Sequence, residues 1–370
     1  MISRRWEDPN YSFIAKDKKG VIYNEFCRAG SPKELEDRLK IKGLEIQEIK
    51  PYDFGEWKKK AADATQKAIW TRVKDRWSHF QSQAKARWTW LTDRDITDIA
   101  GQKKALIAKI QAQTRCTADE AKDQVEAWSL DLVEETAPPG QTVPKTPINF
   151  NDDIWRPLKW HLFELFHGKC AYCECKPRAG QRGDVEHFRP KGKVTEDPDH
   201  PGYYWLAYDY RNYLPSCSSC NQPARAKLTH FPVTGPHAHE PRSLPAESPL
   251  LLNPLDPATD PFQHLEFDEM GAPRPHLGSP KGENSRTIFD LDRPDLTEAR
   301  FEAIQKLEGD WNGRISQNTS ISTAYLELQK EIRSGDREYS AAQLWALDYL
   351  RKKEIDKLLN LPPVVPAAVS

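Results

Sequence analysis

The sequence lacks the features of a membrane or secreted protein. Among its 370 residues there is no uninterrupted apolar stretch of about 18 residues, the length that a membrane-spanning helix needs. The N-terminal residues, Met-Ile-Ser-Arg-Arg-Trp-Glu-Asp-Pro, also lack the apolar core of a signal peptide. From these absences we expect a cytoplasmic protein that binds no membrane.

The chain also has almost no net charge, because 54 basic residues balance 55 acidic ones and leave −1. A general positive charge therefore does not attract nucleic acid, and any such binding must use local basic patches. The length predicts more than one domain. Hydrophobic residues make up 38% and charged residues 29%, which is typical of a polar, soluble protein.

Cysteine is scarce, with seven residues in the chain. Four of them form two Cys-x2-Cys pairs, at Cys170, Cys173, Cys217 and Cys220. Two such pairs are typical of a tetrahedral zinc site that is closed and structural, with no position open to substrate. An odd, scattered remainder suits a reducing compartment better than a disulfide scaffold. The three cysteines without an evident partner are Cys27, Cys116 and Cys175.

Between and just after the cysteine pairs lie residues suited to phosphodiester hydrolysis. A neutral His187 can take a proton from water as general base. The Glu186 carboxylate and the Asn221 carbonyl can bind one divalent ion, Mg²⁺ or Mn²⁺. Asn212, with both donor and acceptor groups, is expected to order the catalytic loop. The basic residues expected to contact phosphates here are Arg189, Lys191 and Lys227.

Each of these features also has a plainer interpretation. Paired Cys-x2-Cys motifs are more often a zinc ribbon for binding than part of a nuclease. A lone histidine in a strand is usually packed or solvent-facing, and an asparagine before a helix is usually a cap or a turn. The ordered combination is more specific than any one member, and it favours a nuclease-type centre.

The same order of residues resembles the HNH endonuclease motif. Glu186-His187 takes its first position, Asn212 the middle one and Asn221 the last, although the family usually has Asp before the first His and His at the end. Four segments resemble the HNH nucleases of Septu-type phage-defence systems, over roughly residues 150–300: Cys-Ala-Tyr-Cys-Glu, Glu-His-Phe-Arg-Pro-Lys, Tyr-Trp-Leu-Ala-Tyr and Leu-Leu-Leu-Asn-Pro. The resemblance implies a ββα-metal fold, cleavage of DNA and a partner ATPase or other defence protein.

Two other functions stay open at this point. The motif acts on phosphate, so it does not distinguish DNA from RNA, which would take a contact to a 2′-hydroxyl group. The chain could also be a nucleic-acid-binding or stress-linked scaffold with a structural zinc site and no catalysis.

The N-terminal part predicts two further units. Residues 1–52 read as a small ββαβ interaction module, with a turn at 17–20 and a helix that begins after Ser31. Residues 56–135 read as helical, with helix-start boxes at Thr92/Asp95 and Thr117/Glu120. Within them, residues 70–128 resemble a CsbD-type stress protein in Trp88-Thr-Trp-Leu-Thr-Asp-Arg-Asp-Ile, Gly101-Gln-Lys and Ala121-Lys-Asp-Gln-Val-Glu-Ala-Trp128.

The start of this helical segment is basic, which gives two interpretations. Its lysines could bind phosphates while its tryptophans stack on bases. Alternatively, the tryptophans form a helical core and the lysines face solvent, which we favour because the aromatic residues recur at helical spacing. The lysines assigned to nucleic acid in the first interpretation are Lys58, Lys59 and Lys60.

The predicted organisation is therefore that of an α+β multidomain protein. A Pro-rich linker at 136–147 precedes a zinc-stabilised HNH nuclease domain at 148–300, in which 251–254 and 262–267 are expected to add strands. Helices follow at 301–360, and residues 361–370 read as a disordered tail.

Overall fold

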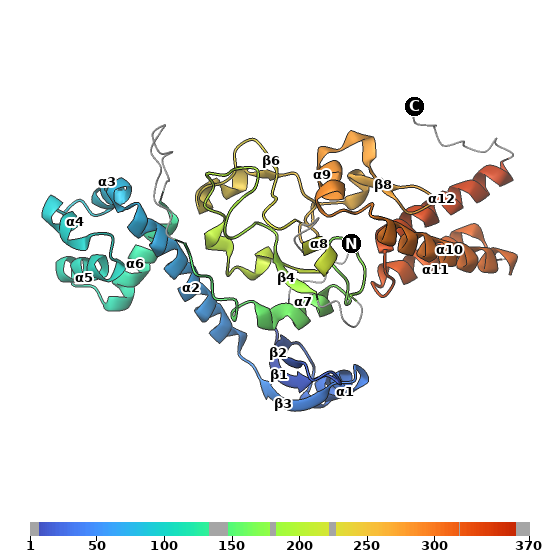
Figure 1. Cartoon of the computed structure of the whole chain (residues 1–370), viewed down its shortest axis with the longest axis horizontal. Helices are drawn as coiled ribbons and strands as arrows, with labels where there is room; N and C mark the ends of the chain where they lie inside the picture. The colour runs from blue at the N-terminus through green and yellow to red at the C-terminus, as the bar shows by residue number, and fades with distance from the viewer. Residues whose placement is uncertain (1–6, 133–146, 178–182, 222–226, 318, 360–370) are drawn as a thin grey trace.

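The computed structural model describes residues 7–132, 147–177, 183–221, 227–317 and 319–359. It mixes helices with small sheets, in agreement with the expected α+β class. Figure 1 shows helices α3–α6 at one end, α10–α12 at the other, and the segment that carries β4 and α8 between them. Apart from residue 147, the expected linker lies outside the described residues, and so does the whole expected tail at 361–370.

The N-terminal ββαβ unit forms as predicted. Its elements are β1 (Tyr11–Lys16), β2 (Ile22–Cys27), α1 (Pro32–Ile41) and β3 (Glu45–Pro51). The strands are antiparallel in the order β2-β1-β3. The Ser31 side chain caps α1 by accepting from the Glu34 backbone N–H, and the side chains of Phe13, Leu35 and Leu39 form the core between helix and sheet.

The segment predicted to be helical forms five helices. They are α2 (Phe54–Asp75), α3 (Trp77–Arg87), α4 (Asp93–Ile99), α5 (Lys103–Thr114) and α6 (Ala118–Leu130). Both predicted capping boxes are present, at Thr92/Asp95 and at Thr117/Glu120. The tryptophans are buried in the packed interior, so the core interpretation of the aromatic residues holds: Trp57, Trp70, Trp77, Trp88 and Trp128.

The middle of the chain has short elements joined by long loops. A 3-10 turn, η1 (Arg156–Leu158), leads into α7 (Lys159–Leu165). Strand β4 (Asp184–His187) pairs antiparallel with β5 (Tyr213–Ser216), and α8 (Ser218–Asn221) follows directly. Between β4 and β5, two more 3-10 turns are η2 (Tyr204–Leu206) and η3 (Tyr210–Asn212).

The strands expected after residue 250 differ from the prediction. Residues 251–254 are not a strand, and only Leu265–Phe267 (β8) of the second stretch is extended. Strand β8 pairs with β9 (Pro273–Pro275) and β6 (Val233–Thr234) with β7 (Ser248–Pro249), each as a sheet separate from β4–β5. Proline within these segments removes backbone donors, which keeps the ladders short.

The remaining helices are α9 (Pro280–Ile288), α10 (Pro294–Ser316), α11 (Ile321–Arg333) and α12 (Ser340–Leu358). The last three pack together around Leu307, Trp311, Leu328 and Leu347, as their apolar spacing predicted. Helix α10 begins seven residues before position 301, where the C-terminal helices were expected to start. It therefore runs across the expected boundary between the nuclease domain and these helices.

The N-terminal region packs directly on the middle of the chain. Phe54 and Trp57 of α2 share an apolar cluster with Trp155 and Tyr213, and the Trp57 indole donates to the Ile154 carbonyl at 2.7 Å. A fragment that begins near residue 148 would expose this cluster to water, which costs free energy of folding. The domain boundaries themselves stay a prediction.

Candidate active site and metal centre

The four cysteines predicted to bind zinc lie together. Their sulfur atoms are all within 4.8 Å of one another, and all four residues are buried. The sulfurs of Cys173 and Cys217 are 3.7 Å apart. Thiolates around one tetrahedral zinc ion, with Zn–S bonds of about 2.3 Å, would lie roughly 3.8 Å apart. Number, kind and spacing of these donors therefore fit a closed four-coordinate metal site.

A fifth cysteine lies beside this cluster, which the sequence did not indicate. The Cys175 sulfur is 3.3 Å from that of Cys173, but Cys175 does not belong to the set of four that surround a common point. Cys27 is buried in the N-terminal unit, where burial raises the pKa of its thiol to about 12. Among the described residues no cysteine forms a disulfide.

His187 ends β4 and is fixed by one hydrogen bond. Its Nε2 lies 2.9 Å from the Ala207 carbonyl oxygen, which can only accept, so Nε2 carries the proton. Nδ1 is then the basic nitrogen, and it bonds to no described residue. The ring packs edge-on against Trp155 and Tyr213, at centroid distances of 4.9 and 5.0 Å. Burial and the nearby charge of Lys191 lower the pKa of His187 well below its ordinary value, so the ring is neutral at pH 7.

Glu186 points to the other side of β4, because neighbouring side chains in a strand alternate. Its Oε1 accepts from the Lys227 ammonium group at 2.9 Å, and Lys227 also donates to the His187 carbonyl at 2.9 Å. The Lys227 side chain is fully buried. Lys227 was expected to contact phosphate, but here it neutralises Glu186 and has no access to a nucleic-acid backbone. Glu186 Oε2 bonds to no described residue.

Asn212 holds the loop that follows β4. Its Oδ1 accepts from the Arg189 backbone N–H at 2.8 Å, and its Nδ2 donates to the Arg189 carbonyl at 3.0 Å. This is the loop-ordering contact that its two-sided amide suggested. Asn221 lies at the end of α8, which packs on β4, and its amide bonds to no described residue.

Some of the other basic residues predicted to bind nucleic acid already form ion pairs within the chain, and others do not. Arg189 pairs with Glu247 at 2.8 Å, so much of its charge is already matched. Lys191 forms no ion pair with a described residue, although the charges of Glu186 and Asp152 act on it, and its ammonium group lies 4.9 Å from the centre of the Trp155 ring. On α2, Lys58 pairs with Asp8 at 2.7 Å, while Lys59 and Lys60 are exposed.

The structure thus gathers part of the predicted site at one place. Charges on Glu186, Lys191 and Lys227 act on one another, and Lys191 and Lys227 both act on His187. A neutral imidazole can deprotonate water, and an ammonium group that forms no ion pair can offset charge on a phosphate. Lys58, Lys59 and Lys60 are not among the residues whose charges act on His187 or on Lys191.

Comparison with known proteins gives two kinds of relative. Over 153 residues the chain is 38% identical to the Septu protein PtuB of Bacillus mycoides strain KBAB4, a match to 40% of the chain and 50% of PtuB. Over 156 residues it is 33% identical to the Septu protein PtuA of the same strain, a match to 21% of PtuA. The chain spans about half the length of this PtuB and about a fifth of PtuA. The resemblance to Septu proteins is thereby confirmed over part of the chain.

The chain covers a larger share of a second relative. Over 52 residues the chain is 36% identical to the UPF0337 protein YjbJ of Escherichia coli strain K12, and these residues make up 75% of YjbJ. The chain belongs to the UPF0337 family. The UPF0337 stretch covers 14% of the chain, so membership says nothing about the rest. The match to YjbJ confirms the resemblance to CsbD-type proteins.

No family profile matches the chain, and no solved structure matches it. Within the described residues, none of the helices combines the length and the apolar character that crossing a membrane would take.

Proposed function

We propose that the chain is a metal-dependent HNH-type endonuclease with a structural zinc site, acting on DNA in bacterial phage defence. One observation carries the proposal: His187 is neutral, its Nε2 is bonded to a carbonyl, and its Nδ1, which bonds to no described residue, can take a proton. The similarity to the Septu protein PtuB, over 40% of the chain, supports the defence role.

In the proposed step, a water oxygen forms a bond to phosphorus and its proton passes to His187 Nδ1. The bond from phosphorus to the leaving oxygen then breaks. Lys191 is the residue whose charge can offset the negative charge that builds up on the phosphate, because it forms no ion pair with a described residue. Asn212 keeps the loop that joins His187 to Lys191 in place.

Two residues would hold the divalent ion, namely Glu186 through Oε2 and Asn221 through its amide oxygen. Both atoms are free of bonds to described residues, and both are the hard oxygen donors that Mg²⁺ and Mn²⁺ prefer. A bound divalent ion supplies charge to the phosphate and to the leaving oxygen. The cysteine cluster would hold zinc and take no part in the chemistry.

The closed state of the centre suggests control by a partner. His187 is 4% exposed, so little of its side chain faces solvent. We therefore propose that the isolated chain cleaves slowly and that an ATPase or other defence protein opens the site. A cytoplasmic location fits this role.

The test is cleavage by the full chain. Supercoiled plasmid and a matched RNA are incubated with the zinc-loaded protein, with Mg²⁺, with Mn²⁺ and with EDTA. We expect the plasmid to be nicked with either ion and left intact in EDTA. Preferential loss of the RNA would make the chain a ribonuclease. No cleavage of either, at high protein concentration and with bound zinc, would favour a nucleic-acid-binding scaffold instead.

A further inference from the structure

Lys227 is fully buried beside residues of the proposed active site. Its side chain is 0% exposed, and its ammonium group contacts Glu186 and His187 of β4. A lysine is almost never fully buried unless a specific partner matches its charge. The role of this ammonium group therefore follows from the atoms that it contacts.

The Lys227 ammonium group bridges two oxygen atoms at the end of β4. It donates to Glu186 Oε1 at 2.9 Å and to the His187 carbonyl oxygen at 2.9 Å. Carboxylate and backbone carbonyl oxygens are also the ligands that hard divalent ions prefer. The end of β4 thus already binds one cation, the lysine itself, through the kind of atoms that a divalent ion would use.

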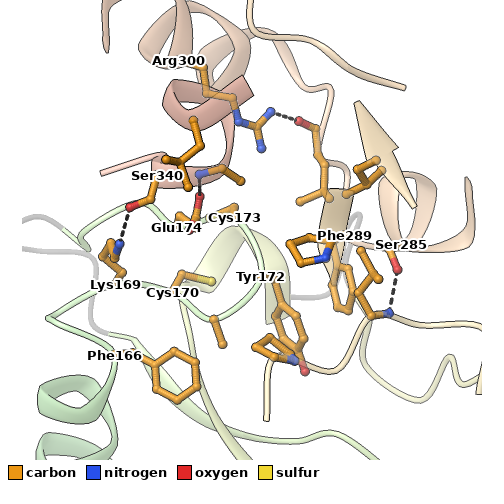
Figure 2. A pocket seen from close by; sticks show the side chains of 18 of the residues that line it. Phe166, Lys169, Cys170, Tyr172, Cys173, Glu174, Ser285, Phe289, Arg300 and Ser340 are labelled. Carbon is orange, nitrogen blue, oxygen red and sulfur yellow. Dashed lines mark hydrogen bonds between the residues drawn. The ribbon is translucent and has the colours of Figure 1, made fainter. Parts of the chain in front are cut away.

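A second buried lysine, Lys169, has acceptors of a different kind. Figure 2 shows its ammonium group bonded to the Ser340 hydroxyl, at 2.8 Å, and it also donates to the Arg337 carbonyl at 3.1 Å. Both acceptors are uncharged, and both lie within the first residue of α12 or the turn before it, so Lys169 joins the cysteine region to the C-terminal helices. Lys227 instead donates to the carboxylate whose Oε2 is proposed to bind the divalent ion.

The charges around Glu186 already balance one another. Glu186 pairs with Lys227, and the charges of Glu186, Asp152 and Lys227 all act on Lys191. Two carboxylates and two ammonium groups therefore cancel, and no surplus negative charge is left to attract a divalent ion. An ion that binds Glu186 would also be repelled by the ammonium group that holds the same carboxylate.

We propose that Lys227 is a built-in counter-ion that competes with the divalent ion for Glu186, so that the free protein binds this ion weakly. The inference rests on the proposed function, because it takes Glu186 as a ligand of that ion. Removing the ammonium charge should free Glu186 for the ion. A lysine that only stabilised the fold would leave the affinity for the ion unchanged.

The test is a Mn²⁺ titration of the zinc-loaded full chain, in which electron paramagnetic resonance measures the free ion and no cleavage is needed. We expect Lys227→Gln, which keeps a hydrogen-bond donor without the charge, to bind Mn²⁺ at least about tenfold more tightly than the parent. Adding Glu186→Gln to this variant should abolish the gain. Lys169→Gln, which removes the other buried ammonium group, should leave the Kd of the parent unchanged.

An equal or higher Kd in a folded Lys227→Gln would overturn the inference, and so would the absence of Mn²⁺ binding from both proteins. If Lys227→Gln does not fold, the parent decides: a Kd below about 10 µM without nucleic acid would overturn the inference, and weaker binding would support it. Plasmid nicking is measured separately. Nicking by the parent together with an unchanged Kd in Lys227→Gln would remove this inference alone, whereas intact plasmid in every condition would remove the proposed function.

Discussion

The middle of the chain contains two buried polar sites whose charges are compensated in different ways. The cysteine cluster brings together four thiols at the spacing of a metal site, and we expect a bound cation to hold them as thiolates. Around β4, the chain supplies both charges itself, as Glu186 and Lys227. The first site should therefore depend on its metal in order to fold, whereas the second can form without one.

The largest effect that separates the two sites should come from the cysteines. Cys217→Ser combined with Cys220→Ser leaves two thiolates, which cannot hold zinc, and zinc binding in small structural sites is worth roughly 10–16 kcal/mol of folding free energy. We expect loss of zinc by elemental analysis and loss of cooperative unfolding by circular dichroism. Cys116→Ser, away from the cluster, should change neither. Full zinc content in a folded double variant would show that these sulfurs are not the ligands.

A smaller effect is expected from the pair at β4. Lys227→Met leaves the buried Glu186 carboxylate unpaired, which typically costs about 3–5 kcal/mol. Combining it with Glu186→Gln should recover part of this loss, because the remaining amide is uncharged. Urea unfolding measures both variants, with Lys193→Met at an exposed position as the control. A single variant as stable as the parent would mean that the ion pair does not form.

Acid should weaken the fold through histidines outside both sites. Burial lowers the pKa of His161 and of His200 to about 4, against the ordinary value of 6.5 expected in the unfolded chain. Between these values the unfolded chain binds more protons, so stability is complete above pH 6.5 and falls as the pH drops toward 4. At pH 5 each histidine should cost about 2 kcal/mol. Urea unfolding at pH 7.5 and 5.0 tests this, and in His161→Gln the drop should shrink by that amount; an equal drop would contradict it.

The smallest effect concerns the basic face of α2. If Lys59 and Lys60 bind phosphates, changing both to Glu should flatten the plot of log affinity for DNA against log salt by about 0.9 for each phosphate that is no longer neutralised. Lys58 is left out because it pairs with Asp8. The matched control is Lys352→Glu with Lys353→Glu, on exposed positions of α12. An unchanged slope would assign this face to solvent.

Much of the fold could be predicted because its signals are local. The capping boxes at Thr92 and Thr117 and the apolar spacing of α10–α12 each act within a few residues, and the structure has them where expected. The two cysteine pairs also carry their geometry in their spacing. The expected strand at 251–254 failed because an apolar run does not specify a pairing partner.

The candidate site was harder to predict because its contacts are long-range. Nothing around Lys227 in the sequence shows that its ammonium group reaches Glu186, 41 residues earlier. In the same way, the carbonyl that sets the His187 tautomer comes from Ala207, 20 residues later. Residue types and their order can suggest a chemistry, but burial and hydrogen-bond partners depend on how distant segments pack.

The most direct test of the account is cleavage by His187→Ala, measured together with its zinc content. General-base catalysis contributes about 10²–10⁴-fold in rate, and His187 is not part of the cysteine cluster. We predict that the variant binds zinc and unfolds cooperatively like the parent, but nicks supercoiled DNA with Mn²⁺ at least about 100-fold more slowly. Nicking at the parent's rate by a folded, zinc-loaded His187→Ala would contradict the account, because the free Nδ1 of His187 would then have no part in catalysis.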